Sequence, residues 1–181
     1  MSKNGLILLT PTSIAYTGTS ASISANGSVE FSACSVLSLN GVFSADYDNY
    51  MIVCRNTSTV NGSSCLTRFL SGGTPAQGAT DYTYQYLYST QSSVTGGRTT
   101  TSGFTTLPFG SGPNGDAMFI YGPYLAQPTA IRSVNIRYNV GTEIFDLTST
   151  HNQSVSYDGI TFIPQASALL SGRIAVYGMR K

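Results

Sequence analysis

Residues 82–88 read Tyr-Thr-Tyr-Gln-Tyr-Leu-Tyr and place a tyrosine at every second position, namely Tyr82, Tyr84, Tyr86 and Tyr88. Side chains in a β-strand alternate between two faces, so this spacing puts all four tyrosines on one face of a strand. A helix would instead distribute them around its axis. The segment therefore predicts a β-strand with an aromatic face.

The rest of the chain is built from similar short segments. Apolar or alternating runs predict further strands over residues 13–23, 29–39, 50–55, 65–70, 118–121, 131–138, 144–147, 159–163 and 173–179. Turn-forming residues separate these runs at Asn26-Gly27, Asn40-Gly41, Asn61-Gly62, Gly72-Gly73, Gly96-Gly97, residues 110–115 and Asp158-Gly159. Glycine after Asn or Asp supplies the positive φ angles of tight hairpins. The order of runs and turns indicates antiparallel pairing.

Helical periodicity is almost absent from the chain, which contains only two Glu and two Lys among its 181 residues. Many short strands with regular turns are typical of sandwiches and jelly rolls. We therefore predict an all-β fold, an antiparallel β-sandwich of jelly-roll type. Residues 1–181 are expected to form one domain, with residues 1–12 as a candidate extended N-terminal arm.

Two of the predicted strands are apolar on both faces. Residues 50–55 are nearly all apolar, and residues 173–179 alternate Ile174, Val176 and Gly178 with Ala175, Tyr177 and Met179. Strands of this kind are usually covered on both sides. We expect both segments to lie deep in the domain, with Arg173 and Arg180 at the ends of the second.

Charged residues make up 9% of the chain, against about 25% in an average soluble domain. Nine Lys and Arg oppose eight Asp and Glu, and they are scattered, so no basic stripe is present to follow phosphates. This argues against nucleic acid as a partner. Either much of the surface is buried against other subunits, or the exposed face suits neutral, hydroxyl-rich partners.

No stretch approaches the ~20 apolar residues of a membrane span, and residues 1–10 lack the pattern of a signal peptide. We therefore expect synthesis in a cytoplasm without a membrane span. Cys34, Cys54 and Cys65 have spacings that match neither a disulfide framework nor a zinc site. A Cys54–Cys65 bridge that closes a hairpin is the alternative, but we favour three free, buried thiols.

The ionisable residues offer few candidates for chemistry. His151 lies in a polar segment and is expected to be a solvated loop residue, without the carboxylate and nucleophile of a triad. Asp46 and Asp48 form the densest group of oxygen ligands and are weak candidates for a calcium site, but we favour turn formation as the explanation for them. The other carboxylates are dispersed. The sequence therefore predicts no enzyme, no cofactor and no catalytic residue.

The tyrosine strand allows two interpretations. Aromatic faces stack on sugar rings, so Tyr82, Tyr84, Tyr86 and Tyr88 are weak candidates for a carbohydrate-binding surface. Tyrosines that are half-buried on a sheet and packed against neighbouring strands are the structural alternative, and we favour it.

Several segments, taken in order, resemble a family of small virion proteins of tailed phages, notably phages of marine bacteria. They are LLTPTS (8–13), VLSLNGVF (36–43), YDNYMIV (47–53), LTRFLSGG (66–73), YTYQY (82–86), YGP (121–123) and LSGRIAVYGMRK (170–181). The resemblance implies a β-sandwich homotrimer on the particle, and it carries no catalytic or ligand residues.

These observations lead to two functional hypotheses. The first is a virion structural protein, a homotrimer that decorates the particle exterior as a head decoration, cement or knob protein in contact with other capsid or tail proteins. The second is a tail-fibre or receptor-binding domain that contacts host surface glycans. Copy number on the particle distinguishes them, because decoration requires hundreds of copies and a fibre only a few tens or fewer.

Overall fold

The computed structural model describes residues 5–60, 62–109, 112–138 and 142–180, and these contain strands and no helix. The strands are β1 (Leu6–Leu9), β2 (Ser13–Ile23), β3 (Val29–Asn40), β4 (Asn49–Ser58), β5 (Ser63–Ser71), β6 (Thr74–Pro75), β7 (Tyr82–Ser89), β8 (Val94–Thr101), β9 (Phe104–Phe109), β10 (Asn114–Tyr121), β11 (Thr129–Tyr138), β12 (Thr142–His151), β13 (Gly159–Pro164) and β14 (Leu170–Met179). The prediction of an all-β fold is confirmed. No helix in this part of the chain is long and apolar enough to cross a membrane.

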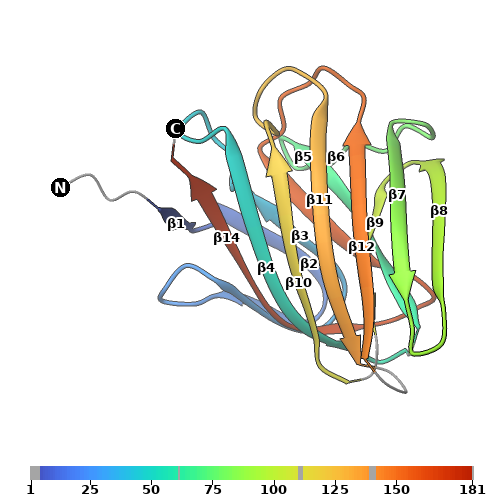
Figure 1. Cartoon of the computed structure of the whole chain (residues 1–181). Coiled ribbons are helices and arrows are strands. Elements are labelled where there is room, and N and C mark those ends of the chain that lie inside the picture. Colours follow the sequence, from blue (N-terminus) through green and yellow to red (C-terminus); the bar gives the residue numbers. More distant parts are fainter. Residues whose placement is uncertain (1–4, 61, 110–111, 139–141, 181) are drawn as a thin grey trace.

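Every strand pair is antiparallel, and hydrogen bonds join the strands into one curled sheet. The strand order is β6-β5-β13-β3-β14-β4-β10-β11-β12-β7-β8, with β1 paired to β14, β2 to β3 and β9 to β5. Figure 1 shows the consequence of the curl: β14, β4, β10, β11, β12, β7 and β8 form one layer, and β3, β13 and β5 lie behind it. This arrangement is consistent with the predicted sandwich of jelly-roll type.

Strand β3 belongs to both layers. Its first half pairs with β14, from Val29 to Cys34, and its second half pairs with β13, from Leu37 to Leu39. The bend between them coincides with a bulge, where Ala33 adopts a positive φ of 47°. Gly18 of β2 passes close to this bulge, because a Cβ there would lie 2.4 Å from the carbonyl oxygen of Ala33. The bulge therefore lets one long strand leave one layer and enter the other.

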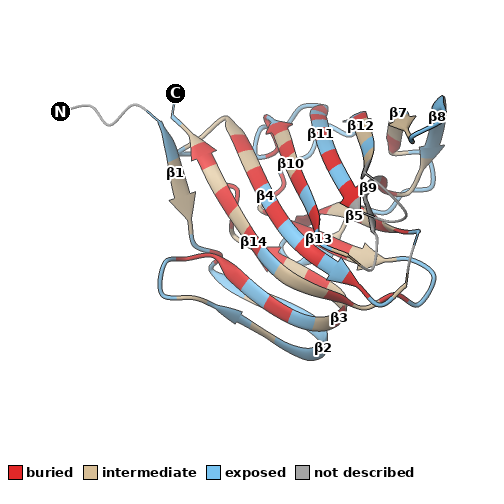
Figure 2. Cartoon of the chain, turned by 60° about the horizontal axis from the view of Figure 1, so that its bottom comes forward, coloured by how far each residue is buried: buried red, intermediate tan, exposed pale blue. Residues whose placement is uncertain are grey.

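The core lies between the two layers and is rich in aromatic residues. Its largest fully buried side chains are Phe43, Tyr50, Phe69, Tyr82, Phe104 and Phe162, with Leu39, Ile52, Leu70 and Met118. Figure 2 shows the resulting pattern, in which buried and exposed residues alternate along β4, β10 and β11. We call the layer formed by β14, β4, β10, β11, β12, β7 and β8 the large layer. Its inner face is the one toward the core, and its outer face is the opposite one.

The expectation that residues 50–55 are covered on both faces was wrong. In β4, Tyr50, Ile52 and Cys54 are buried, whereas Val53 and Arg55 are exposed on the outer face. The C-terminal segment differs in the same way. Ile174 and Val176 of β14 are buried and Arg173 and Arg180 are exposed, as predicted, but the residues on its outer face are only half-buried. Nothing within the described chain covers this face, so an apolar sequence did not mean two covered faces.

Two segments that were predicted to be a turn and an extended arm contain strands. Gly96 and Gly97, interpreted as a turn, lie within β8, where Gly97 pairs with Tyr86. A Cβ on Gly97 would lie 2.7 Å from the Tyr86 hydroxyl, so glycine is required there for close packing of the ring and not for a turn. Within the candidate arm, residues 6–9 form β1, which pairs with β14 from Leu6↔Met179 to Leu9↔Val176.

Candidate functional site

His151 is a core residue, and its prediction as a solvated loop residue was wrong. It ends β12 with 0% of its surface exposed, because the alternation that buries Leu147 and Ser149 also turns residue 151 inward. Its ring contacts Phe69, Tyr82 and Tyr157 at centroid distances of 5.8, 4.3 and 5.0 Å. Burial lowers the pKa of its imidazole, which favours the neutral form. Its nearest polar partner is the Tyr157 hydroxyl, 3.4 Å away, so the geometry is that of packing.

The tyrosines of β7 lie together on the inner face, as the alternation predicted. Tyr82 is fully buried, and its hydroxyl accepts a hydrogen bond from the Phe69 amide at 3.0 Å. Tyr86 stacks on Phe145 with centroids 5.2 Å apart. Protein thus covers the ring of Tyr82 and one face of Tyr86, and the rings of Tyr84, Tyr86 and Tyr88 are half-buried, which favours the structural interpretation of these residues.

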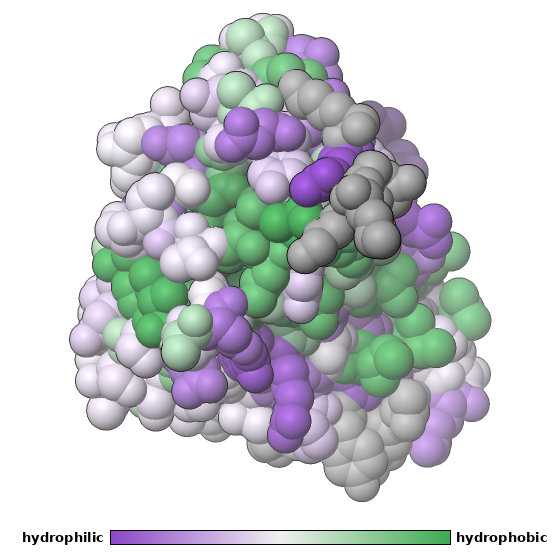
Figure 3. Space-filling view, turned by 90° about the vertical axis from the view of Figure 1, so that its left-hand side faces the viewer, coloured by the Kyte–Doolittle hydropathy of each residue, from purple (hydrophilic) through white to green (hydrophobic). Residues whose placement is uncertain are grey.

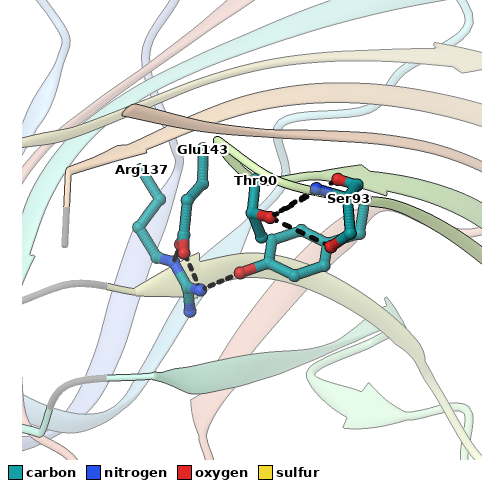
Figure 4. Close-up of polar contacts among 5 residues, drawn as sticks. Thr90, Ser93, Arg137 and Glu143 are labelled. Carbon is teal, nitrogen blue, oxygen red and sulfur yellow. Dashed lines mark hydrogen bonds and ion pairs between the residues drawn. The ribbon is translucent and has the colours of Figure 1, made fainter. Parts of the chain in front are cut away.

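Tyr88 joins a largely buried ion pair at the other end of the same face. Arg137 of β11 pairs with Glu143 of β12 and donates a hydrogen bond from Nη2 to the Tyr88 hydroxyl at 2.7 Å. Figure 4 shows this pair beside the β7–β8 turn, in which the Thr90 hydroxyl accepts a hydrogen bond from the Ser93 amide at 3.2 Å. The charges of Arg137 and Glu143 neutralise each other. These two residues and Tyr88 therefore connect β7, β11 and β12, and neither charge is left unpaired for a ligand.

Asp46 and Asp48 lie in the loop between β3 and β4. The Ser44 hydroxyl donates to the Asp46 carboxylate at 3.3 Å and accepts from the Asp46 amide at the same distance. Tyr50 supports the loop, since its hydroxyl donates to the Ser44 carbonyl at 2.8 Å. These contacts are those of a turn. Across the described residues, no three His, Cys, Asp or Glu side chains cluster closely enough to hold a metal ion.

A polar cluster that was not predicted from the sequence is buried between the layers. Asp116 is buried on β10, where it accepts a hydrogen bond from the Ser133 hydroxyl at 2.7 Å. Asn135, its neighbour in register on β11, is fully buried, and neither its amide nitrogen nor its amide oxygen has a partner. Burial raises the pKa of the Asp116 carboxyl from 3.8 to about 7. The only signal in the sequence was alternation, which places residues 116 and 118 on the same face.

All three cysteines are buried and free, as predicted. Burial raises the pKa of each thiol, that of Cys54 to about 12. A thiol with such a pKa is protonated at neutral pH and is a poor nucleophile. The cysteines therefore belong to the core and offer no reactive group.

Exposed aliphatic side chains gather on the outer face of β7, β8, β11 and β12. We call this set the aliphatic patch; its members are Leu87 (60% exposed), Val94 (71%), Val134 (36%), Ile136 (54%) and Ile144 (48%). Ile136 and Ile144 are directly paired, and Asp146 lies between Val134 and Leu87 in register. Asp146 is neutralised by Arg132 at 3.0 Å. The patch is thus contiguous and carries no unpaired charge.

The patch adjoins a free sheet edge. Strand β8 ends the strand order and, within the described part of the chain, pairs only with β7; its eight residues include one charge, Arg98, and no proline. Strand β2 is a second free edge of 11 residues with no charge at all. Soluble proteins usually protect such edges with charges, proline or a covering element, because free edges pair with other chains. The candidate site of this protein is therefore a surface, the aliphatic patch together with the edge of β8.

Comparison of the sequence with protein-family models finds no match, and comparison with curated proteins finds none either. The resemblance to phage virion proteins thus stays an expectation.

Proposed function

We propose that this chain is a non-enzymatic structural subunit that assembles with copies of itself into a homotrimer on the exterior of a tailed-phage particle. The observation that carries self-assembly is the aliphatic patch beside the free edge of β8. Exposed apolar surface of this kind on a soluble protein marks an interaction site. A second copy is the partner of choice, because the surface is neutral and the whole chain has a net charge of only +1.

The placement on a particle has a different basis. It rests on the resemblance of residues 8–13, 36–43 and 170–181 to tailed-phage virion proteins, and it agrees with a chain of which only 9% of the residues are charged. Within the proposal, the protein decorates the head or forms a knob, in contact with other capsid or tail proteins.

The self-assembly proposal predicts that Ile136→Lys converts the trimer into monomers. A lysine in the centre of the patch would have to lose its hydration in the interface, whereas in the monomer position 136 is open to water and the fold is unaffected. We expect trimerisation to weaken at least ~100-fold, since a buried unpaired charge costs several kcal/mol. Sedimentation velocity at micromolar concentration measures the change.

Thr150→Lys is the matched control, because it adds the same charge to an exposed position of β12 outside the patch. This variant should remain a trimer. A parent protein that sediments as a monomer, or an Ile136→Lys variant that stays trimeric, contradicts the proposed interface.

The particle location has its own test. Mass spectrometry of purified particles should detect this chain at hundreds of copies, and cryo-electron microscopy should place it in threefold clusters on the surface. Particles that lack the chain would rule out the virion role, and a copy number of a few tens or fewer would place it in the tail.

A further inference from the structure

A groove of about 680 Å³ crosses the outer face of the large layer at β4 and β14. The aliphatic patch lies on the same face but at the opposite end of the layer. Leu8 of β1 and Asn26 of the β2–β3 hairpin are among the residues that line it. Figure 3 views the molecule from the side on which β1 and β14 lie, and apolar residues are in the middle of that view with hydrophilic ones beneath them. The volume lies within the range of about 300 to 1,000 Å³ found for small-ligand sites.

Two arginines stand side by side in this groove. Arg55 of β4 and Arg173 of β14 are directly opposite each other in register, and both are exposed. Like charges at such a position repel, and sheets usually avoid them. Arg173 is held in place by a hydrogen bond from its Nε to the Ser28 hydroxyl at 2.8 Å. The guanidinium of Arg55 has no hydrogen bond or ion pair with any described residue.

No ion pair among the described residues neutralises either arginine of this pair. The two ion pairs in the described chain are Arg132–Asp146 and Arg137–Glu143, and neither involves Arg55 or Arg173. Glu30 of β3 faces Arg173 in register, but the two form no ion pair. An oxyanion between the arginines would relieve the repulsion and accept paired hydrogen bonds from both planar guanidinium groups.

The other residues that line the groove indicate the kind of molecule to which the oxyanion belongs. Thr57, Ser171 and Asn26 supply hydroxyl and amide groups, and Tyr177, Val53 and Ala175 supply an aromatic ring and small apolar surfaces. Dense hydroxyl and amide groups beside an aromatic ring match the alternating polar and apolar faces of a sugar.

We propose that this groove binds an acidic saccharide, with the carboxylate or ester sulfate of a sugar unit held between Arg55 and Arg173. The hydroxyls of the sugar contact Thr57, Ser171 and Asn26, and its apolar face lies against Tyr177. The proposal goes beyond self-assembly and does not rest on it, since the groove and the aliphatic patch use different strands.

Isothermal titration calorimetry of the whole protein tests the site with four probes: trigalacturonate, a sulfated trisaccharide of similar size, a neutral trisaccharide and inorganic sulfate. We expect an acidic trisaccharide to bind and the neutral one not to bind. Arg55→Gln and Arg173→Gln should each weaken binding by about tenfold or more, the value of one charge-assisted hydrogen-bonded pair. The comparison of carboxylate with sulfate identifies the preferred substituent.

Arg98→Gln is the matched control, because Arg98 is an exposed arginine on the same outer face, at β8 and outside the groove. It should leave binding unchanged, and Glu30→Gln should strengthen it by removing a nearby negative charge. The proposal is overturned if neither acidic trisaccharide binds at millimolar concentration or if the neutral one binds equally. Equal binding of inorganic sulfate, or equal weakening by Arg98→Gln, overturns it as well. Sedimentation of the same variants reports separately on the trimer.

Discussion

At about pH 8, the Asp116→Asn variant is expected to melt on the order of 10 °C above the parent protein. Asp116 is buried, and one side chain, that of Ser133, donates a hydrogen bond to its carboxylate. A single hydrogen bond does not replace the hydration that the ionised carboxylate loses on burial. Its pKa rises from 3.8 to about 7 for this reason. Since each tenfold change in an ionisation constant is worth about 1.4 kcal/mol, the ionised carboxylate costs the fold on the order of 4 kcal/mol. Asparagine retains the hydrogen bond from Ser133 and removes the charge.

The pH dependence of this effect has a definite sign. The folded pKa is raised, so between about pH 4 and pH 7 the folded protein holds a proton that the unfolded chain releases, and the parent loses stability as the pH rises through that window. The advantage of Asp116→Asn should therefore fall below ~1 kcal/mol at about pH 4 and reach its full value above pH 7. His151 has a lowered pKa and destabilises the fold on acidification, but it does so in both proteins and cancels in the difference.

Asp146→Asn is the control for Asp116→Asn. Asp146 is partly exposed on the outer face and pairs with Arg132, so its substitution should change the free energy of unfolding by no more than ~1 kcal/mol and in the destabilising direction. Differential scanning calorimetry of the three proteins between pH 4 and pH 8 makes the comparison. If Asp116→Asn is less stable than the parent at pH 8, the ionised carboxylate has a stabilising partner and our description of the cluster is incorrect.

Much of the fold could be predicted because side-chain alternation is a local property. The predicted strand over residues 13–23 coincides with β2, and the tyrosines of β7 share a face as their spacing required. Alternation does not reveal how many faces are covered, because coverage depends on distant strands. For that reason Val53 was expected to be buried and is exposed. The strand β8 was missed because Gly97 serves the packing of Tyr86, a contact that only the pairing register discloses.

The candidate surfaces were harder to predict, since each is assembled from separated segments. Arg55 and Arg173 are far apart in the sequence and become neighbours only through the pairing of β4 with β14. Ile136 and Ile144 form a local hairpin pair, but Leu87 and Val94 join them through the pairing of β12 with β7 and of β7 with β8. His151 was placed wrongly because its polar neighbours outweighed the alternation from Leu147, which correctly points it inward. Composition predicted an interacting surface, and only the strand order identifies the residues that are candidates for it.

The second large effect is expected from Val176→Asp, which should leave the protein unfolded or insoluble. Val176 is 2% exposed on β14, in the centre of the sheet between β1 and β4, where it pairs with Leu9 and Ile52. A carboxylate there loses its hydration without gaining a partner, at a cost of several kcal/mol against a total stability of roughly 5 to 15 kcal/mol. The yield of soluble protein and its far-ultraviolet circular dichroism measure the outcome.

The neighbouring strand offers a control with the same chemical change. Val53 of β4 is 39% exposed on the outer face, so in Val53→Asp the carboxylate keeps contact with water. Arg55 projects from the same face of that strand two residues away, and its charge favours the new carboxylate. Val53→Asp should therefore fold and melt within about 1 kcal/mol of the parent. If both variants fold equally well, the inner face at β14 is not a closed core; if both fail, valine is needed in the sheet for its β-propensity and not for the side that it buries.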